Sequence, residues 1–213
     1  MKILIVVATF SEIEPFLKSL GLNSIPETGI NTDAHHINII ITGVGMVATA
    51  YATGKEFATH NYDLALNLGV GGSFSKRLEI GELVQITTDV FSELGAEDDE
   101  EFISLDELAL GETLFNGSDE PKFNTSLKKG TAITVNKVHG NEDTIADVKE
   151  MFNPKIESME GAAFFYACEE ANIPGIQVRA ISNYVEKRNR ERWNIPLAVK
   201  NLNAWLIQYL KEI

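Results

Sequence analysis

The chain alternates short, strongly apolar segments with longer segments whose apolar residues recur at helical spacing. The apolar runs are rich in β-branched residues, which is typical of strands covered on both faces of a sheet. The pattern predicts strands at residues 3–7, 37–41, 63–68, 83–88, 131–135 and 175–181.

Helices are predicted between and after these strands, at residues 46–59, 158–171 and 194–213. The last segment places its apolar residues on one face, and Pro196 stands in its first turn, where proline is tolerated. This alternation indicates an α/β fold with a mostly parallel central sheet flanked by helices. There is no repeat, low-complexity tract or linker, so we expect residues 1–213 to form a single domain.

Charge narrows the range of partners. There are 31 acidic residues against 18 Lys and Arg, a formal net charge of −13, which disfavours nucleic acid and anionic membranes as partners. Four bases lie close together at 187–192, beside acidic residues, and are expected to form a solvated turn. Residues 89–121 carry twelve carboxylates and no Lys or Arg, and we interpret them mainly as a solvated insertion.

The cellular setting is predicted from two simple features. A single cysteine, Cys168, cannot form an intramolecular disulfide, which favours a reducing cytoplasm. The first apolar run, residues 3–10, is too short to span a membrane and is followed by acids rather than by a cleavage site.

The residues that follow the strands are the best candidates for chemistry, because ligands of open α/β sheets bind beyond the carboxyl ends of the strands. Four such segments, 8–12, 42–45, 67–72 and 179–183, are expected to surround one crevice.

Several familiar chemistries fit this crevice poorly. Gly43, Gly45 and Ala48 match a dinucleotide fingerprint, but Asp63 begins a strand instead of ending one, so tight helix packing explains these glycines equally well. No phosphate-binding P-loop and no Gly-x-Ser-x-Gly elbow is present. The four histidines share no ligand spacing and there is no second cysteine, so we predict no metal.

Carboxylates are the remaining candidates. Glu12 follows a buried strand, and Glu157 and Glu160 lie where a strand meets a helix. Each could be an ordinary helix-start acid. Two acids from distant parts of the chain, converging with the amide of Asn183, could instead activate a water molecule and bind a diol.

The segments ATFSE, TGVG, LNLGVGG, SMEGAA and RAISN occur in this order along nearly the whole chain, and together they resemble the nucleoside phosphorylase and nucleosidase superfamily. Within it, the chain is most similar to the futalosine hydrolases. That similarity rests on ELGAED, TVNKVHG, ESMEGAAFFYA and RAISNYVEKRNRERWNIPLA.

The resemblance implies hydrolysis of futalosine to hypoxanthine and dehypoxanthinyl futalosine, a step of menaquinone biosynthesis, without a cofactor. It implies that Glu12 orients or deprotonates the attacking water, that Met159 packs under the sugar, and that Glu160 binds the ribose hydroxyls. It also implies a homodimer or larger homo-oligomer, for which the helix at 46–59 offers an apolar face.

Further substrate contacts are expected from the same resemblance. Gly69, Val70 and Glu157 are expected to bind substrate, and Val138 is expected to pack on the purine. His139, next to Val138, is expected to be structural. The substrate's benzoate is expected to meet Lys137 or a base within 187–192.

Three departures from the superfamily pattern bear on specificity. Adenine-releasing nucleosidases carry Asp where this chain has Asn183, and an amide suits a 6-oxopurine such as hypoxanthine. Val70 stands where many relatives place a hydroxyl, for which Ser73 could compensate. Because the first arginine is Arg77, and the Gly43 and Gly69 loops contain none, water is favoured over phosphate as nucleophile.

Other functions remain open from the sequence. They are a methylthioadenosine or S-adenosylhomocysteine nucleosidase, a purine nucleoside phosphorylase, and a nucleoside-binding module without activity.

Overall fold

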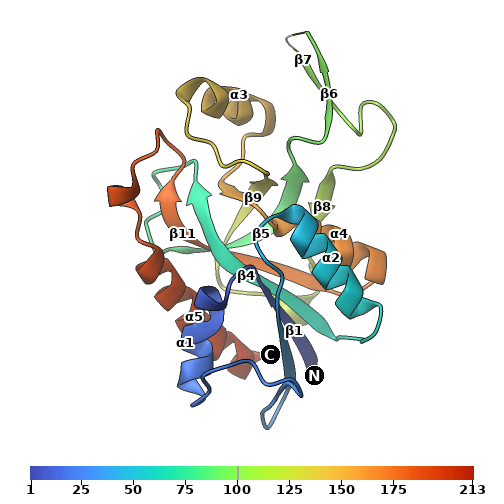
Figure 1. Cartoon of the computed structure of the whole chain (residues 1–213), viewed down its shortest axis with the longest axis vertical. Helices are drawn as coiled ribbons and strands as arrows, with labels where there is room; N and C mark the ends of the chain where they lie inside the picture. The colour runs from blue at the N-terminus through green and yellow to red at the C-terminus, as the bar shows by residue number, and fades with distance from the viewer. Residues whose placement is uncertain (100) are drawn as a thin grey trace.

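The computed structural model describes residues 1–99 and 101–213, which fold around one large β-sheet (Figure 1). Among these residues nine strands form the sheet, eight of them in the order β10-β9-β5-β11-β4-β1-β3-β2, while β8 pairs with β5. The strands are β1 Lys2–Val7, β2 Ile30–Asn31, β3 His36–Ile41, β4 Leu64–Ser73, β5 Leu83–Phe91, β8 Leu114–Asn116, β9 Lys128–Thr134, β10 Ile156–Ser158 and β11 Gly175–Tyr184.

The sheet is mixed, so the expectation of a mostly parallel sheet holds only for part of it. Strands β3, β1, β4 and β11 run parallel to one another, but β5 runs antiparallel to β11. No helix lies between Ser73 and Leu83, and without a crossover helix the chain enters β5 in the opposite direction. The fold is nevertheless an α/β fold, as predicted.

A short strand closes part of the sheet on itself. Strand β10 pairs with β9 on one side and with the end of β4 on the other. Strands β4, β11, β5, β9 and β10 therefore form a closed ring, and this ring brings Glu157 of β10 next to the carboxyl end of β4.

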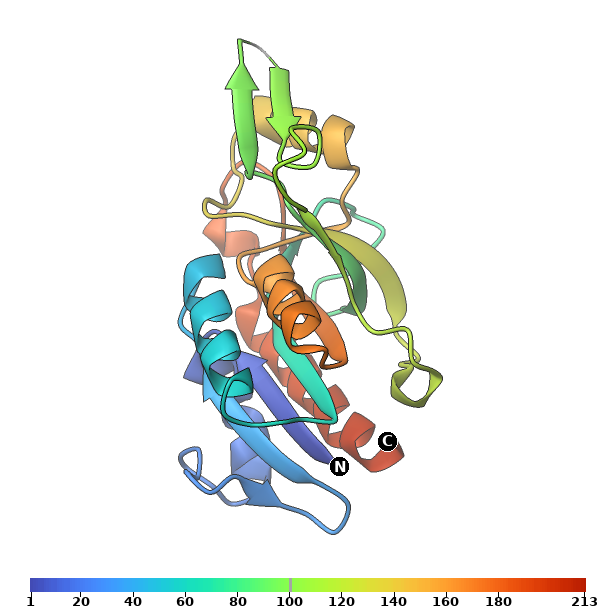
Figure 2. The ribbon, with the colours of Figure 1, turned by 90° about the vertical axis from the view of Figure 1, so that its right-hand side faces the viewer.

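Helices cover both faces of the sheet. Helices α1 (Phe10–Ser19) and α5 (Ile195–Glu212) pack together on one face, over a core that includes Ile3, Ile5 and Val7. Helices α2 (Met46–Phe57) and α4 (Gly161–Ala171) lie side by side on the other face (Figure 2). Alternate residues of β1 therefore contribute to two different cores, as a doubly covered strand requires.

Some elements differ from the sequence prediction. Helix α1 and helix α3 (Glu142–Phe152) were not predicted, and α4 begins three residues later than expected because 156–158 pair as β10. Strands β4 and β11 continue to Ser73 and Tyr184, beyond the predicted ends.

The acidic stretch 89–121 is only partly the solvated insertion that the sequence suggests. Its exposed part is a hairpin of β6 (Gly95–Asp98) and β7 (Glu101–Ser104) that projects from the body (Figure 2). Asp89, in contrast, is completely buried in β5. Glu100, another acid of this stretch, lies outside the described residues. Within the described chain, no helix has the length and apolar character needed to cross a bilayer.

Candidate active site

A cavity of about 440 Å³ lies where β1, β4, β10 and β11 end, which is the crevice that the sequence predicted. This volume is in the range of small-molecule sites. Its lining includes seven of the eight predicted site residues, namely Glu12, Val70, Val138, Glu157, Met159, Glu160 and Asn183.

Glu12 is a buried carboxylate at the start of α1. Its Oε2 accepts hydrogen bonds from the backbone N–H (2.9 Å) and hydroxyl (3.1 Å) of Thr9, as expected for a first-turn acid. Its Oε1 faces β4 instead and accepts from the backbone N–H of Val70 at 3.3 Å. Burial raises the pKa of Glu12, and the hydrogen bonds and the nearby Arg179 oppose this rise only in part. A buried carboxylate with a raised pKa, open to a cavity, is suited to act as a general base.

Glu160 precedes α4, but its side chain does not cap that helix. Its Oε1 accepts the backbone N–H of Gly45, at 3.0 Å, where α2 begins. The amino end of α2 therefore already holds a carboxylate at the position where a dinucleotide fold binds phosphate. This contact argues against the dinucleotide interpretation of Gly43 and Gly45. Asp63 supports the same conclusion, since it bonds Lys2 N–H at the opposite end of the strands.

Arg179 lies beneath the two acids and is almost completely buried. Glu160, Asp89 and Glu12 all act electrostatically on its guanidinium, which donates to the side chain of Asn67. Glu12 and Glu160 line the cavity and Arg179 does not, so acidic side chains face this part of the cavity.

Gly69 does not line the cavity, in contrast to its predicted role in substrate binding. A Cβ on Gly69 would lie 3.0 Å from Glu12 Oε1 and 3.1 Å from Arg179 Nη1. The glycine therefore leaves room for the Glu12 carboxylate and the Arg179 guanidinium. Ser73 also lies outside the lining, because its hydroxyl bonds the backbone of Ser75.

Glu157 and His139 form a pair on the β10 side of the cavity. The ring Nδ1 of His139 bonds Glu157 Oε2, and the backbone N–H of His139 donates to Oε1 at 3.1 Å. Burial raises the pKa of Glu157, while the hydrogen bonds from His139 act in the opposite direction. His139 has a structural role, as expected, because it holds the side chain of Glu157. It also lines the cavity.

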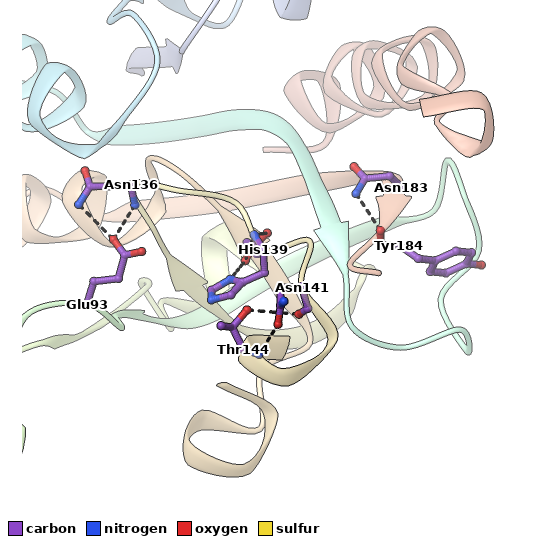
Figure 3. Close-up of polar contacts among 8 residues, drawn as sticks. Glu93, Asn136, His139, Asn141, Thr144, Asn183 and Tyr184 are labelled. Atoms are coloured by element: carbon purple, nitrogen blue, oxygen red, sulfur yellow. Dashed lines mark hydrogen bonds and ion pairs between the residues drawn. The ribbon is translucent and has the colours of Figure 1, made fainter. Parts of the chain in front are cut away.

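Asn183 lines the cavity from β11, which pairs with β4 on the side away from β10 (Figure 3). Its Oδ1 accepts the hydroxyl of Ser182 at 2.8 Å, and its Nδ2 donates to the carbonyl of Tyr184 at 3.0 Å. These two bonds fix the orientation of the amide, and the second N–H of Nδ2 remains available for a ligand. Sequence reasoning missed Ser182, although it stands next to Asn183 in the RAISN segment.

The open side of the cavity combines apolar and cationic groups. Val138 and Met159 contribute apolar surface, as expected, and Trp193 adds an aromatic ring that sequence analysis did not single out. Arg188 also lines the cavity and lies 5.0 Å from the centre of the Trp193 ring. Lys137 does not line the cavity. Of the bases in the predicted 187–192 turn, Arg188 is the one that does. No group of three His, Cys, Asp or Glu side chains in the described ranges is placed to hold a metal ion.

Known proteins share this architecture. A model of the phosphorylase superfamily matches residues 2–211. The futalosine hydrolase of Thermus thermophilus is 29% identical over 96% of this chain and 91% of that protein. The aminodeoxyfutalosine nucleosidase of Campylobacter jejuni is 28% identical, with 86% of each chain covered. A solved structure of a futalosine hydrolase mutant from Helicobacter pylori is only 18% identical but has a TM-score of 0.85 and is matched over 100% of both chains, which shows a common fold. Because the family model matches almost its entire length, this chain belongs to the phosphorylase superfamily.

Proposed function

We propose that this chain hydrolyses the N-glycosidic bond of futalosine and releases hypoxanthine and dehypoxanthinyl futalosine. The observation that carries the proposal is the arrangement of Glu12, Glu160 and Asn183 around one cavity. The similarity to futalosine hydrolases over most of their length supports the choice of substrate.

The arrangement matches the charge changes of the reaction. Breaking an N-glycosidic bond builds positive charge on the sugar and negative charge on the departing base. Glu12 and Glu160 lie together with Arg179 at the ends of β1 and β4, so the sugar belongs on this anionic side. Asn183 can donate to the base, where negative charge develops.

Glu12 then acts as the general base in this proposal. It takes a proton from water while that water attacks the anomeric carbon, and Glu160 accepts hydrogen bonds from the ribose hydroxyls. The Gly45 N–H, already bonded to Glu160, keeps that carboxylate in place. At the mouth of the cavity, the guanidinium of Arg188 is suited to the benzoate of the substrate.

Water rather than phosphate is the proposed nucleophile. A phosphorylase has to hold a phosphate dianion with cationic or N–H donors. Here the buried Arg179 donates to Asn67 and lies in the electrostatic field of Glu160, Asp89 and Glu12, and the N–H of Gly45 is bonded to Glu160. The Gly45 N–H is therefore already engaged by a carboxylate, and Arg179 does not line the cavity.

We further propose that the protein works in the cytoplasm as a homodimer or larger homo-oligomer. Helix α2 exposes apolar side chains, with Val47 79% and Tyr51 71% exposed. A second cavity of about 480 Å³, lined by residues of α2, α4 and the acidic stretch, adjoins this helix. Exposed apolar surface of this kind marks association sites.

Product analysis tests the proposed reaction. The protein is incubated with futalosine, methylthioadenosine or inosine, with and without phosphate, and the free base is separated by chromatography. The proposal predicts hypoxanthine from futalosine in phosphate-free buffer. Preferential release of adenine from methylthioadenosine, or release that requires phosphate, would contradict it.

A further inference from the structure

Helix α1 carries a proline, Pro15, in the turn that follows Glu12. Proline has no N–H to donate to the carbonyl four residues earlier, here that of Ser11, and its ring opens a helix at this point. Ser11 is exposed, so water can bind its carbonyl. The next pair of the helical ladder is the Glu12 carbonyl and the Phe16 N–H. Both residues are buried, so a bond that the proline opens here has to be replaced by contacts within the protein.

Asn203 of α5 supplies a partner to each of these two groups. Its Nδ2 donates to the Glu12 carbonyl at 2.9 Å, and its Oδ1 accepts the Phe16 N–H at 3.0 Å. The same Nδ2 also donates to the Val199 carbonyl, one turn earlier in α5, at 2.7 Å. One side-chain amide thus joins the main chains of α1 and α5, which pack against each other (Figure 1).

The contact requires an amide in one orientation. Asn203 is only 2% exposed, its oxygen faces an N–H, and its nitrogen faces two carbonyls, so a reversed amide would bring like groups together. An aspartate in its place has no hydrogen to donate, and a serine has only one. The chain therefore has a side chain here whose donors and acceptor match the opened turn of α1.

The turn that Asn203 holds also carries the Glu12 carboxylate. One oxygen of this carboxylate bonds Thr9, which is the N-cap of the same helix and moves with it. The other oxygen accepts from the Val70 N–H of the sheet at 3.3 Å, which is long for a hydrogen bond. The position of the carboxylate in the cavity therefore depends on how the first turn of α1 is held against the rest of the protein.

We propose that Asn203 is a positioning residue for the reaction. By bridging the Glu12 carbonyl and the Phe16 N–H beside Pro15, it holds the first turn of α1 so that the Glu12 carboxylate stays within reach of the attacking water. Asn203 itself does not line the cavity, so it acts through Glu12 and not on the substrate. The inference rests on the proposed function, because it takes Glu12 to be the general base.

The test removes the bridge and then makes it unnecessary. Asn203→Ser loses the contacts with α1, because a serine hydroxyl in a helix bonds back to its own helix. Pro15→Ala returns an N–H to α1 and allows a regular ladder, so the helix no longer needs the bridge. Asn201→Ser is the matched control, since Asn201 lies on the same helix and its Nδ2 donates to the Gly81 carbonyl at 2.8 Å, between β4 and β5.

Two quantities are measured on each full-length variant. The first is the pair kcat and KM for futalosine. The second is the pKa of Glu12, followed by NMR of isotopically labelled glutamate carboxyl groups and assigned by comparison with Glu12→Gln. The charged groups that act on this carboxylate are Arg179 of β11 and Glu160 before α4, and both are kept in every variant.

Asn203→Ser is expected to lower kcat by roughly 10- to 100-fold with little change of KM, which is the scale of a misplaced catalytic group. The pKa of Glu12 is expected to fall toward that of an ordinary carboxyl, because a carboxylate that is no longer held in place becomes more hydrated. Adding Pro15→Ala is expected to restore most of kcat, and Asn201→Ser is expected to change neither quantity. In the Glu12→Gln background, Asn203→Ser is expected to cost no further kcat, because the base that it positions is absent.

Several results would overturn the inference and leave the proposed function intact. They are a loss of kcat in Asn203→Ser no larger than in Asn201→Ser, an unchanged pKa of Glu12, and an equal loss of kcat with and without Glu12. If Asn203→Ser does not fold alone, its combination with Pro15→Ala decides, since recovery of folding and kcat supports the bridge and a folded but slow protein contradicts it.

Failure of the proposed function gives a different pattern. An unmodified protein that does not hydrolyse futalosine contradicts the proposed reaction, while the NMR titration still tests the bridge. A pKa of Glu12 that falls in Asn203→Ser but not in Asn201→Ser supports the positioning of Glu12, and a pKa that stays unchanged in both overturns it.

Discussion

Replacing Glu12 by Gln removes the proposed general base with little change of shape. One Gln oxygen can keep both hydrogen bonds from Thr9, but the amide NH₂ then faces the N–H of Val70. Leaving one buried donor unsatisfied costs about 1–3 kcal/mol of stability. A protein that folds with this cost still has Glu160 and Asn183 in the cavity.

The catalytic loss is expected to be much larger than the structural one. General base catalysis contributes typically about 10²- to 10⁴-fold, and each factor of ten corresponds to about 1.4 kcal/mol of barrier. We therefore expect kcat for futalosine to fall by that factor while KM changes little, because Glu12 acts in the transition state.

The pH profile gives an independent signature. The base must be ionised, so activity is lost as pH falls through the pKa of Glu12, and burial raises this pKa above that of an ordinary carboxyl. In the unmodified protein, kcat is therefore expected to fall on the acidic side at a higher pH than an ordinary carboxyl would give. This fall is expected to be absent in Glu12→Gln.

The assay is hypoxanthine release in phosphate-free buffer, with folding checked by circular dichroism. Glu14→Gln serves as the matched control, since Glu14 lies on the same helix, has a side chain that is 41% exposed, and pairs with Lys18 at 3.0 Å. A folded Glu12→Gln protein that loses less than tenfold in kcat, or that keeps the acidic limb, would refute the role of Glu12.

Three further predictions address the base, the buried network and the assembly. Asn183→Asp is expected to shift the ratio of kcat/KM values toward 6-aminopurine nucleosides, and an unchanged ratio would remove the amide from the specificity argument. Burial raises the pKa of Asp89 from 3.8 to about 6, so the folded state favours the protonated carboxyl. The stability that this protonated carboxyl contributes is lost as pH rises from about 4 through 6. Relative to Asp89→Asn, the unmodified protein should therefore lose up to about 3 kcal/mol of unfolding free energy between pH 4 and pH 7 in urea titrations, and parallel curves would contradict the burial argument. Val47→Glu on the exposed face of α2 is expected to lower the mass measured by light scattering to that of a monomer, whereas an unmodified protein that is already monomeric would exclude the proposed oligomer.

Much of the fold was predictable because buried strands leave a strong local signal. The apolar runs that became β1, β3 and β11 were recognised, and so was the rule that ligands bind beyond strand ends. That rule predicted Glu12 and Asn183 at a common crevice, and Glu160, predicted at the junction of a strand and a helix, lines the same cavity in the structure.

The missed features depend on contacts between distant segments. The direction of β5 and the closure by β10 follow from pairing across the sheet, and a three-residue strand has too little periodicity to be recognised. Helix α3 was missed although Ile145, Val148 and Met151 recur at helical spacing, because the segment is short, mostly polar and buries none of its residues.

The details of the site were hidden for the same reason. Gly69 was expected from the resemblance to contact the substrate, whereas in the structure it leaves room for Glu12 and Arg179. The pairing of Glu157 with His139 joins residues 18 positions apart, and no local pattern indicates it.

Mass analysis of the products formed from futalosine in water labelled with heavy oxygen tests the central claim most directly. The account predicts free hypoxanthine without label and a sugar that carries one labelled oxygen at its anomeric carbon, in equal amounts and without dependence on phosphate. Intact futalosine, or a sugar released as its phosphate ester, would contradict it.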